Sequence, residues 1–372
     1  MRMNRKPPSR PASTKKPPRW PGWPRKMTGQ LDVEWREQWF KGVVVRPECV
    51  ECRSALRTRP YRTRARGLCL NPGGVRQTQR HASEERGLLG DVVEHLRCPH
   101  CLGDLGMAGR ALTCPRGHSF DIARQGYVSL LRGDARPGTA DTREMVDARA
   151  AFLAGGHLSA VADTVASECR RLAPDASGGA IVDVGAGTGY YLAAALDRLP
   201  GRPGIALDIS KHAARRAARA HPRIGAVVCD AWRSLPVRTG AAAAVLSVFS
   251  PRNGAETRRI LRPDGALLLV TPTQEHLAEL VPALGLVRVD ERKEERLGDQ
   301  FGGFFHLERR CLCNVPLSLG HADVERLVGM GPSARHTDPA TTRERVGALP
   351  APISVTSSLT VSIYRPAPSV PG

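Results

Sequence analysis

From residue 180 onward, short apolar runs alternate along the chain with longer segments whose apolar residues recur at helical spacing. The short runs predict buried strands, and the periodic segments predict helices. Strands and helices in alternation are typical of an α/β fold, in which helices cover both faces of a parallel sheet. Strands are predicted at 180–185, 204–210, 225–231, 241–250 and 265–272, and helices at 190–199, 211–221, 255–261 and 275–285.

Two further segments flank this alternating region. Residues 140–173 have helical periodicity that Gly155 and Gly156 interrupt, which predicts two consecutive helices. Residues 353–365, ISVTSSLTVSIYR, alternate between apolar and polar positions. This alternation predicts an antiparallel strand that closes one edge of the sheet.

The first 88 residues lack such periodicity and are rich in Pro and Arg. They carry 21 Lys and Arg against 7 Asp and Glu, whereas residues 89–372 carry 34 against 29, so most of the net charge of +19 lies in this leader. We interpret residues 1–88 as a basic leader that is either disordered or the product of a mis-assigned start, with the true start near Leu88–Val93. The chain has no apolar run of about 18 residues and no secretory signal, so we expect a cytoplasmic protein without a membrane span.

Residues 89–135 contain a metal-ligand pattern of the form C-x2-C-x12-C-x3-H. Three thiolates and one imidazole fill the four positions of a tetrahedral zinc site and leave none for water, which predicts a structural zinc ion in a small zinc-binding domain. His100 is the competing imidazole, and we expect it to point outward because it lies between two ligands. The predicted ligands are Cys98, Cys101, Cys114 and His118.

The turn after the first predicted strand, VDVGAGTGYY, holds three glycines, and an aspartate ends each of the first three strands. Glycine lets the backbone turn tightly and lets a ligand approach closely. A carboxylate after the second strand can accept hydrogen bonds from both ribose hydroxyls, and one after the third can reach an adenine amino group. A glycine turn alone also fits a dinucleotide site, and each aspartate alone also fits a helix cap. Together they predict a nucleoside site formed by Asp183, Gly185, Gly187, Gly189, Asp208 and Asp230.

The motifs DVGAGTG, LDIS, CDA and VLSVFSP resemble those of class I S-adenosylmethionine-dependent methyltransferases over residues 180–285. The resemblance implies a Rossmann-like, seven-stranded sheet whose last strand is antiparallel, within a methyltransferase domain at 136–372. It also implies that the methionine end of S-adenosylmethionine lies at the glycine turn.

The zinc pattern, followed by FDIARQGYVSLL, MVDARAAFLAGGH, VDVGAGTGYY and VERLVGMGPSARH, resembles the RlmA family of 23S rRNA (guanine-N1)-methyltransferases over residues 93–367. The sequence is closest to the actinomycete branch that includes tylosin-resistance, TlrB-like enzymes. This resemblance implies methyl transfer to N1 of a guanine in hairpin 35 of 23S rRNA, a zinc domain that helps to hold the RNA, a homodimer and a contribution to macrolide resistance.

The resemblance also assigns roles to individual residues. In the segment VFSPRN we expect Phe249 to stack on the target base, Ser250 or its backbone to hydrogen-bond the base edge, and Arg252 to contact a phosphate or the guanine carbonyl. The segment offers no carboxylate as a general base. Near the cofactor the resemblance places Tyr190, Tyr191 and His276, and Leu158 stands where the family often has tyrosine.

Two other functions fit the same motifs. One is a small-molecule methyltransferase that carries a zinc domain, and the other is a non-catalytic, zinc-containing RNA-binding protein. Binding of S-adenosylmethionine separates the enzymes from the binding protein. Salt separates the two enzymes, because RNA binding weakens steeply as salt rises.

Overall fold

The structure is a computed structural model, and it describes residues 89–134, 140–174, 178–286, 301–335 and 337–368. The leader for which we predict disorder or a mis-assigned start lies outside these residues. Among the described residues, none of the helices has both the length and the apolar character needed to cross a bilayer.

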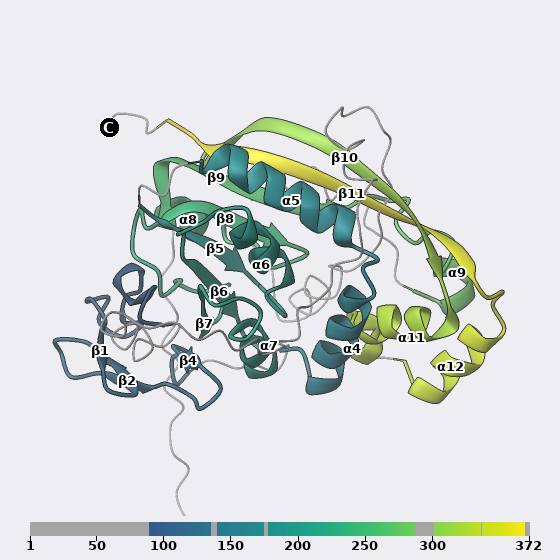
Figure 1. Cartoon of the computed structure of the whole chain (residues 1–372), viewed down its shortest axis with the longest axis horizontal. Helices are drawn as coiled ribbons and strands as arrows, with labels where there is room; N and C mark the ends of the chain where they lie inside the picture. Colours follow the sequence, from purple (N-terminus) through teal and green to yellow (C-terminus); the bar gives the residue numbers. More distant parts are fainter. Residues whose placement is uncertain (1–88, 135–139, 175–177, 287–300, 336, 369–372) are drawn as a thin grey trace, which may run out of the picture. The chain divides into compact units, whose positions relative to one another are not determined.

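An eight-stranded sheet organises the described residues, with the order β10-β11-β9-β8-β5-β6-β7-β4 (Figure 1). Strands β4 to β9 run parallel to one another, whereas β11 is antiparallel to both β9 and β10. The strands are β4 (Tyr127–Ser129), β5 (Ala180–Val184), β6 (Gly204–Asp208), β7 (Ile224–Val228), β8 (Ala242–Val248), β9 (Leu261–Pro272), β10 (Phe305–Leu319) and β11 (Ile353–Pro366).

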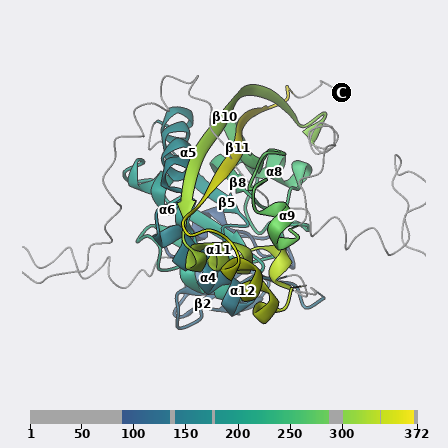
Figure 2. The ribbon, with the colours of Figure 1, turned by 90° about the vertical axis from the view of Figure 1, so that its right-hand side faces the viewer.

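The α/β, Rossmann-like fold is confirmed, and all six strands predicted from the sequence are present. The prediction that 353–365 closes the edge of the sheet is wrong, because β10 pairs with β11 along its whole length and takes the edge instead. Figure 2 shows the two long strands β10 and β11 running side by side. The eighth strand, β4, comes from the predicted zinc-binding domain and pairs with β7.

The helices include α4 (Arg143–Ala154), α5 (Ser159–Leu172), α6 (Tyr190–Asp197), α7 (Lys211–Ala217), α8 (Gly254–Ile260), α9 (Val281–Leu284), α11 (His321–Gly329) and α12 (Pro339–Gly347). The predicted pair at 140–173 is confirmed as α4 and α5, and Thr142 caps α4 by accepting a hydrogen bond from the Met145 N–H. Of the helix predicted at 275–285 only α9 forms. Its second residue, Pro282, has no N–H to donate and fits only the first turn of a helix.

Alternate residues of the central strands face two separate hydrophobic cores. In β9, Leu268 and Val270 belong to the core beneath α4, α5 and α6, whereas Leu267 and Leu269 belong to the core on the other face. That second core also contains Leu96 and Leu112 of the zinc-binding segment. The predicted zinc-binding segment and the eight-stranded sheet therefore share one hydrophobic core.

Candidate active site and metal centre

The zinc-binding segment is a three-stranded antiparallel sheet formed by β1 (Gly106–Ala108), β2 (Ala111–Thr113) and β3 (Ser119–Asp121), with two tight turns that carry the ligands. In the first turn the Leu102 N–H donates to the Cys98 carbonyl (2.9 Å), and in the second the Gly117 N–H donates to the Cys114 carbonyl (2.9 Å). Both donors have positive φ, 61° at Leu102 and 80° at Gly117. These turns let two ligands close in sequence point toward one centre.

The four predicted ligands meet at that centre. The Sγ atoms of Cys98, Cys101 and Cys114 and a ring nitrogen of His118 all lie within 4.8 Å of one another. His118 Nδ1 is 3.3 Å from Cys114 Sγ and 3.5 Å from Cys98 Sγ. Burial acts to raise the pKa of Cys114, but hydrogen bonds from the His118 side chain and backbone lower it to about 6.

This donor set fits a structural zinc ion. Three thiolates and an imidazole occupy the four tetrahedral positions, and a low thiol pKa favours the deprotonated form that zinc binds. His100 is exposed, as predicted, and its ring stacks on Phe120 with the ring planes 9° apart instead of joining the cluster.

The glycine turn between β5 and α6 is the cofactor-binding element predicted from the sequence. Gly185, Gly187 and Gly189 all have positive φ, at 72°, 54° and 77°. A Cβ atom on Gly185 would lie 2.5 Å from Cβ of Ser250, so the turn and the predicted target segment are in direct contact. Only glycine allows this approach.

Asp208, at the end of β6, ties the glycine turn to the next strand. One carboxylate oxygen accepts a hydrogen bond from the Gly187 N–H (2.8 Å), and the other accepts from the Ser210 N–H (2.8 Å). Burial raises its pKa to about 6, although these two hydrogen bonds act in the opposite direction. Each oxygen keeps a further lone pair, so the carboxylate can still accept the two hydroxyls of a ribose.

Asp183, at the end of β5, is a buried carboxyl with an unfilled hydrogen-bonding site. It is 1% exposed, and its Oδ2 has no hydrogen-bond partner among the described residues. Burial, and then the charge of Asp208, raises its pKa to about 8. A buried carboxyl oxygen without a partner costs free energy, and the ammonium group of a bound amino acid would supply one. The residues at the turn therefore fit S-adenosylmethionine.

Asp230 follows β7 and begins the loop that leads to α8. Its Oδ1 accepts a hydrogen bond from the Trp232 N–H (3.0 Å), and its Oδ2 is 3.6 Å from Nε of Arg233. The loop therefore holds the carboxylate in place at the same edge of the sheet as Asp183 and Asp208.

A cavity lies beside the glycine turn. Its walls are mainly apolar, and Phe249, Tyr191 and His276 from the predicted site line it, together with Leu158. The predicted target-segment residues Ser250 and Arg252 are buried, at 2% and 8% exposure, and are not among the lining residues. Tyr190 is partly buried against the core and is likewise not a lining residue.

Phe249 is the target-segment residue that this geometry singles out. Its φ is 53°, in a region that a bulky side chain rarely adopts, and such strain clusters at functional sites. Behind it, the hydroxyls of Ser250 and Ser247 lie 3.0 Å apart and fix the segment from inside.

Several polar cavity residues were missed from the sequence. Arg149 of α4 forms an ion pair with Asp141 and donates to the Met330 carbonyl, and Ser357 comes from β11. The hydroxyls of Ser357 and Tyr191 are buried and have no hydrogen-bond partner among the described residues. The sequence segments that carry Arg149 and Met330 belong to the RlmA-like motifs, which is the signal that pointed to this region.

Comparison with known proteins agrees with this arrangement. Residues 96–134 match the family model for the N-terminal part of RlmA, and residues 181–265 match a methyltransferase-domain model. The chain is 52% identical over 292 residues to a protein of Micromonospora griseorubida assigned as a 23S rRNA (guanine-N(1)-)-methyltransferase, covering 74% of this chain and 99% of the relative.

Two further relatives carry related names. The 23S rRNA (guanine(748)-N(1))-methyltransferase of Streptomyces fradiae is 49% identical over 278 residues, covering 75% of this chain and 99% of the relative. The YxjB protein of Bacillus subtilis, also assigned as a 23S rRNA (guanine-N(1)-)-methyltransferase, is 33% identical over 190 residues, covering 50% of this chain and 66% of the relative. With two relatives matched over almost their full length at about half identity, and with the zinc cluster and glycine turn both formed, the chain belongs to the RlmA family of 23S rRNA (guanine-N1)-methyltransferases.

Proposed function

We propose that this protein transfers a methyl group from S-adenosylmethionine to N1 of a guanine in 23S rRNA. The observation that carries the proposal is that the glycine turn, with Asp183 and Asp208 beside it, lies next to an apolar cavity in a chain that aligns with 99% of a 23S rRNA (guanine(748)-N(1))-methyltransferase. The target guanine enters this cavity, and the cofactor lies over the turn.

When bound, S-adenosylmethionine supplies a methyl group on a sulfonium: guanine N1 forms the new C–N bond as the C–S bond breaks, and the N1 proton passes to solvent. The described residues that line the cavity include no Asp or Glu, so no carboxylate there serves as a general base. The protein's contribution is then alignment of guanine N1 with the methyl group. Alignment of well-oriented groups can lower an activation barrier by about 7–11 kcal/mol.

The cavity residues divide this task between them. Phe249, held in its strained conformation, offers an aromatic face on which the flipped base can stack. The unpartnered hydroxyls of Tyr191 and Ser357 can donate to or accept from the polar edge of guanine. The apolar walls of the cavity can pack against the base.

We further propose that the target is a guanine in hairpin 35. This guanine would be equivalent to guanine 748, which the name of the Streptomyces fradiae enzyme specifies. The zinc-binding segment holds the RNA, the protein acts as a homodimer in the cytoplasm, and methylation contributes to macrolide resistance.

The proposal is tested with methyl-labelled S-adenosylmethionine and 23S rRNA that lacks the modification. After nuclease digestion, the label is expected in N1-methylguanosine, identified by mass spectrometry. Label in another nucleoside would contradict the assignment of guanine N1. Cofactor binding without any labelled RNA would point to a small-molecule methyltransferase, and failure to bind the cofactor would point to a non-catalytic RNA-binding protein.

A further inference from the structure

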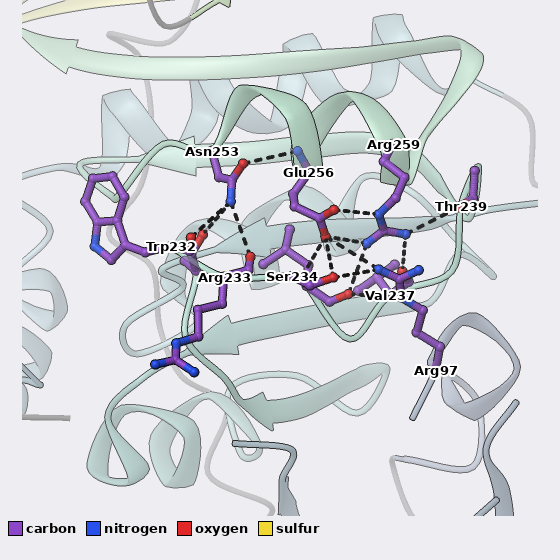
Figure 3. Close-up of polar contacts among 11 residues, drawn as sticks. Arg97, Trp232, Arg233, Ser234, Val237, Thr239, Asn253, Glu256 and Arg259 are labelled. Atoms are coloured by element: carbon purple, nitrogen blue, oxygen red, sulfur yellow. Dashed lines mark hydrogen bonds and ion pairs between the residues drawn. The ribbon is translucent and has the colours of Figure 1, made fainter. Parts of the chain in front are cut away.

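A polar network joins the zinc-binding segment to the start of α8 through the loop 231–235 (Figure 3). This loop follows Asp230, and α8 begins directly after the target segment that contains Phe249. The network therefore involves the two segments that directly follow the predicted adenine contact and the predicted base contact in the chain.

Asn253 fastens the first half of the loop. Its Nδ2 donates to the carbonyls of Ala231, Trp232 and Arg233 at 3.4, 3.4 and 3.3 Å, while its Oδ1 caps α8 by accepting from the Glu256 N–H at 3.2 Å. One side chain thus holds both the loop and the first turn of the helix.

Glu256 fastens the second half of the loop. Its Oε2 accepts from the Leu235 N–H (2.7 Å) and the Ser234 hydroxyl (3.2 Å), and Arg259 donates to both carboxylate oxygens at 2.7 and 2.8 Å. Burial acts to raise the pKa of Glu256, but the Arg259 and Leu235 hydrogen bonds outweigh it and hold the pKa below its ordinary value. Glu256 is therefore a charged anchor for the loop.

Arg97, one residue before the first zinc ligand, reaches the same anchor from the zinc-binding segment. Its Nη2 donates to the Ser234 hydroxyl (2.8 Å) and lies 3.6 Å from Glu256 Oε2, while its Nε donates to the Leu235 carbonyl (3.4 Å). The side chains of Arg97 and Glu256 are only 13% and 19% exposed, so solvent screens this contact weakly.

We propose that Arg97 is a positioning residue for the cofactor site, acting through Glu256 and the loop 231–235 on Asp230. The loop holds Asp230 directly, because the Trp232 N–H donates to its carboxylate and Arg233 lies beside it. The zinc-binding segment therefore shapes the adenine side of the cofactor site in addition to holding RNA. This inference deepens the proposed function and rests on its cofactor site, but not on the identity of the RNA.

The test measures affinity for S-adenosylhomocysteine by calorimetry without RNA, for the wild type and for Arg97→Met. Losing hydrogen bonds that hold the loop is expected to weaken binding about three- to tenfold, the range for one or two net hydrogen bonds. Arg97→Lys keeps the charge but lacks the guanidinium fork, so an intermediate loss is expected. Arg110→Met is the matched control, because it removes the same charge from an exposed position of the zinc-binding segment, and it should bind like the wild type.

A comparison of two ligands separates a positioning role from a general structural defect, which would weaken the binding of both ligands equally. The loss caused by Arg97→Met should shrink for an analogue of S-adenosylhomocysteine that lacks the adenine amino group, since Asp230 faces that group in our account. Zinc content is measured for each variant. If Arg97→Met loses zinc, the affinity of Asn253→Ser for S-adenosylhomocysteine is measured instead. Ser still caps α8 but cannot donate hydrogen bonds to the three loop carbonyls, so weaker binding is expected.

Wild-type affinity in Arg97→Met with full zinc, or in Asn253→Ser, would overturn the inference, as would an equal loss for both ligands. Failure of the wild type to methylate 23S rRNA would instead overturn the proposed function and leave these binding measurements valid.

Discussion

Asp183 is the residue of the site whose protonation is most strongly perturbed. Its pKa is raised to about 8 from an ordinary value of 3.8, mainly by burial. Without cofactor the carboxyl is therefore neutral at pH 7. It must lose its proton to pair with the ammonium group of the cofactor, so binding should release a proton and should tighten as the pH rises toward 8.

Replacement of Asp183 by Asn tests this account in two ways. Cofactor affinity is expected to fall about 10- to 100-fold, the effect of losing a charged hydrogen bond, as measured by calorimetry. Because the folded-state pKa lies above the unfolded value, the contribution of Asp183 to wild-type stability without cofactor is fully present below about pH 4 and is lost as the pH rises through 8. Asp183→Asn removes this loss, so its melting temperature should exceed that of the wild type at pH 9 but not at pH 4. Equal pH profiles would contradict the raised pKa.

Gly185→Ala tests the contact between the glycine turn and the target segment. The new Cβ would lie 2.5 Å from Cβ of Ser250, at a residue whose φ of 72° already disfavours alanine. We expect methyl transfer to fall at least about 100-fold, because a misplacement of about 1 Å has that effect on aligned groups. Gly347→Ala is the control, since a Cβ there meets nothing within 4 Å, and it should retain activity.

For single residues, the sequence predicts which residue types form a site better than it predicts which side chains face the cavity. The zinc ligands and the three glycines followed from spacing, because that spacing is tied to local turns. The buried positions of Ser250 and Arg252, and the cavity roles of Arg149 and Ser357, depend on contacts between distant segments. No local pattern encodes such contacts.

Among the structural elements, the contact between β7 and the residues just before the zinc ligands is unusually close. A Cβ on Gly225 would lie 2.2 Å from Cγ2 of Val92, which is fully buried. The zinc-binding segment thus packs into a space that glycine leaves open on the sheet.

Gly225→Ala should therefore destabilise the protein by about 1–3 kcal/mol, the usual cost of overpacking, as measured by chemical denaturation. The double variant Val92→Ala/Gly225→Ala should recover much of this loss, because the smaller side chain returns the space. If the two substitutions were additive instead, this packing contact would not be the cause.

The sequence predicted the central strands of the sheet, because their residues are apolar on both faces. Strand β10 was missed because as an edge strand it exposes residues such as Leu307 and Leu312, so its sequence lacks a buried run. Because β10 was missed, β11 was predicted to be the edge strand, whereas it is the second strand from the edge. Strand β4 is only three residues long and joins the sheet through a distant partner, β7, which no local signal reveals.

At the scale of the whole molecule, the zinc-binding segment and the catalytic sheet form one structural unit in the described residues. They share a hydrophobic core that includes Leu96, Leu112 and Leu269, and β4 extends the sheet. The zinc-binding segment and the methyltransferase sheet therefore form one packed body.

Removal of zinc tests this unity. Chelation is expected to lower the melting temperature of the whole protein in a single transition, because unfolding of the zinc-binding segment exposes part of the shared core. Two separate calorimetric transitions, with the methyltransferase melting unchanged, would show that the segment folds independently. Restoring zinc should return the original transition.

The most direct test of the account is primer extension on 23S rRNA that lacks the modification, after incubation with the protein and S-adenosylmethionine. Reverse transcriptase cannot pair a base with N1-methylguanine, so we expect one new stop, in hairpin 35, that depends on the cofactor and is lost in Gly185→Ala. Absence of any stop from a preparation that binds both zinc and S-adenosylmethionine would contradict it.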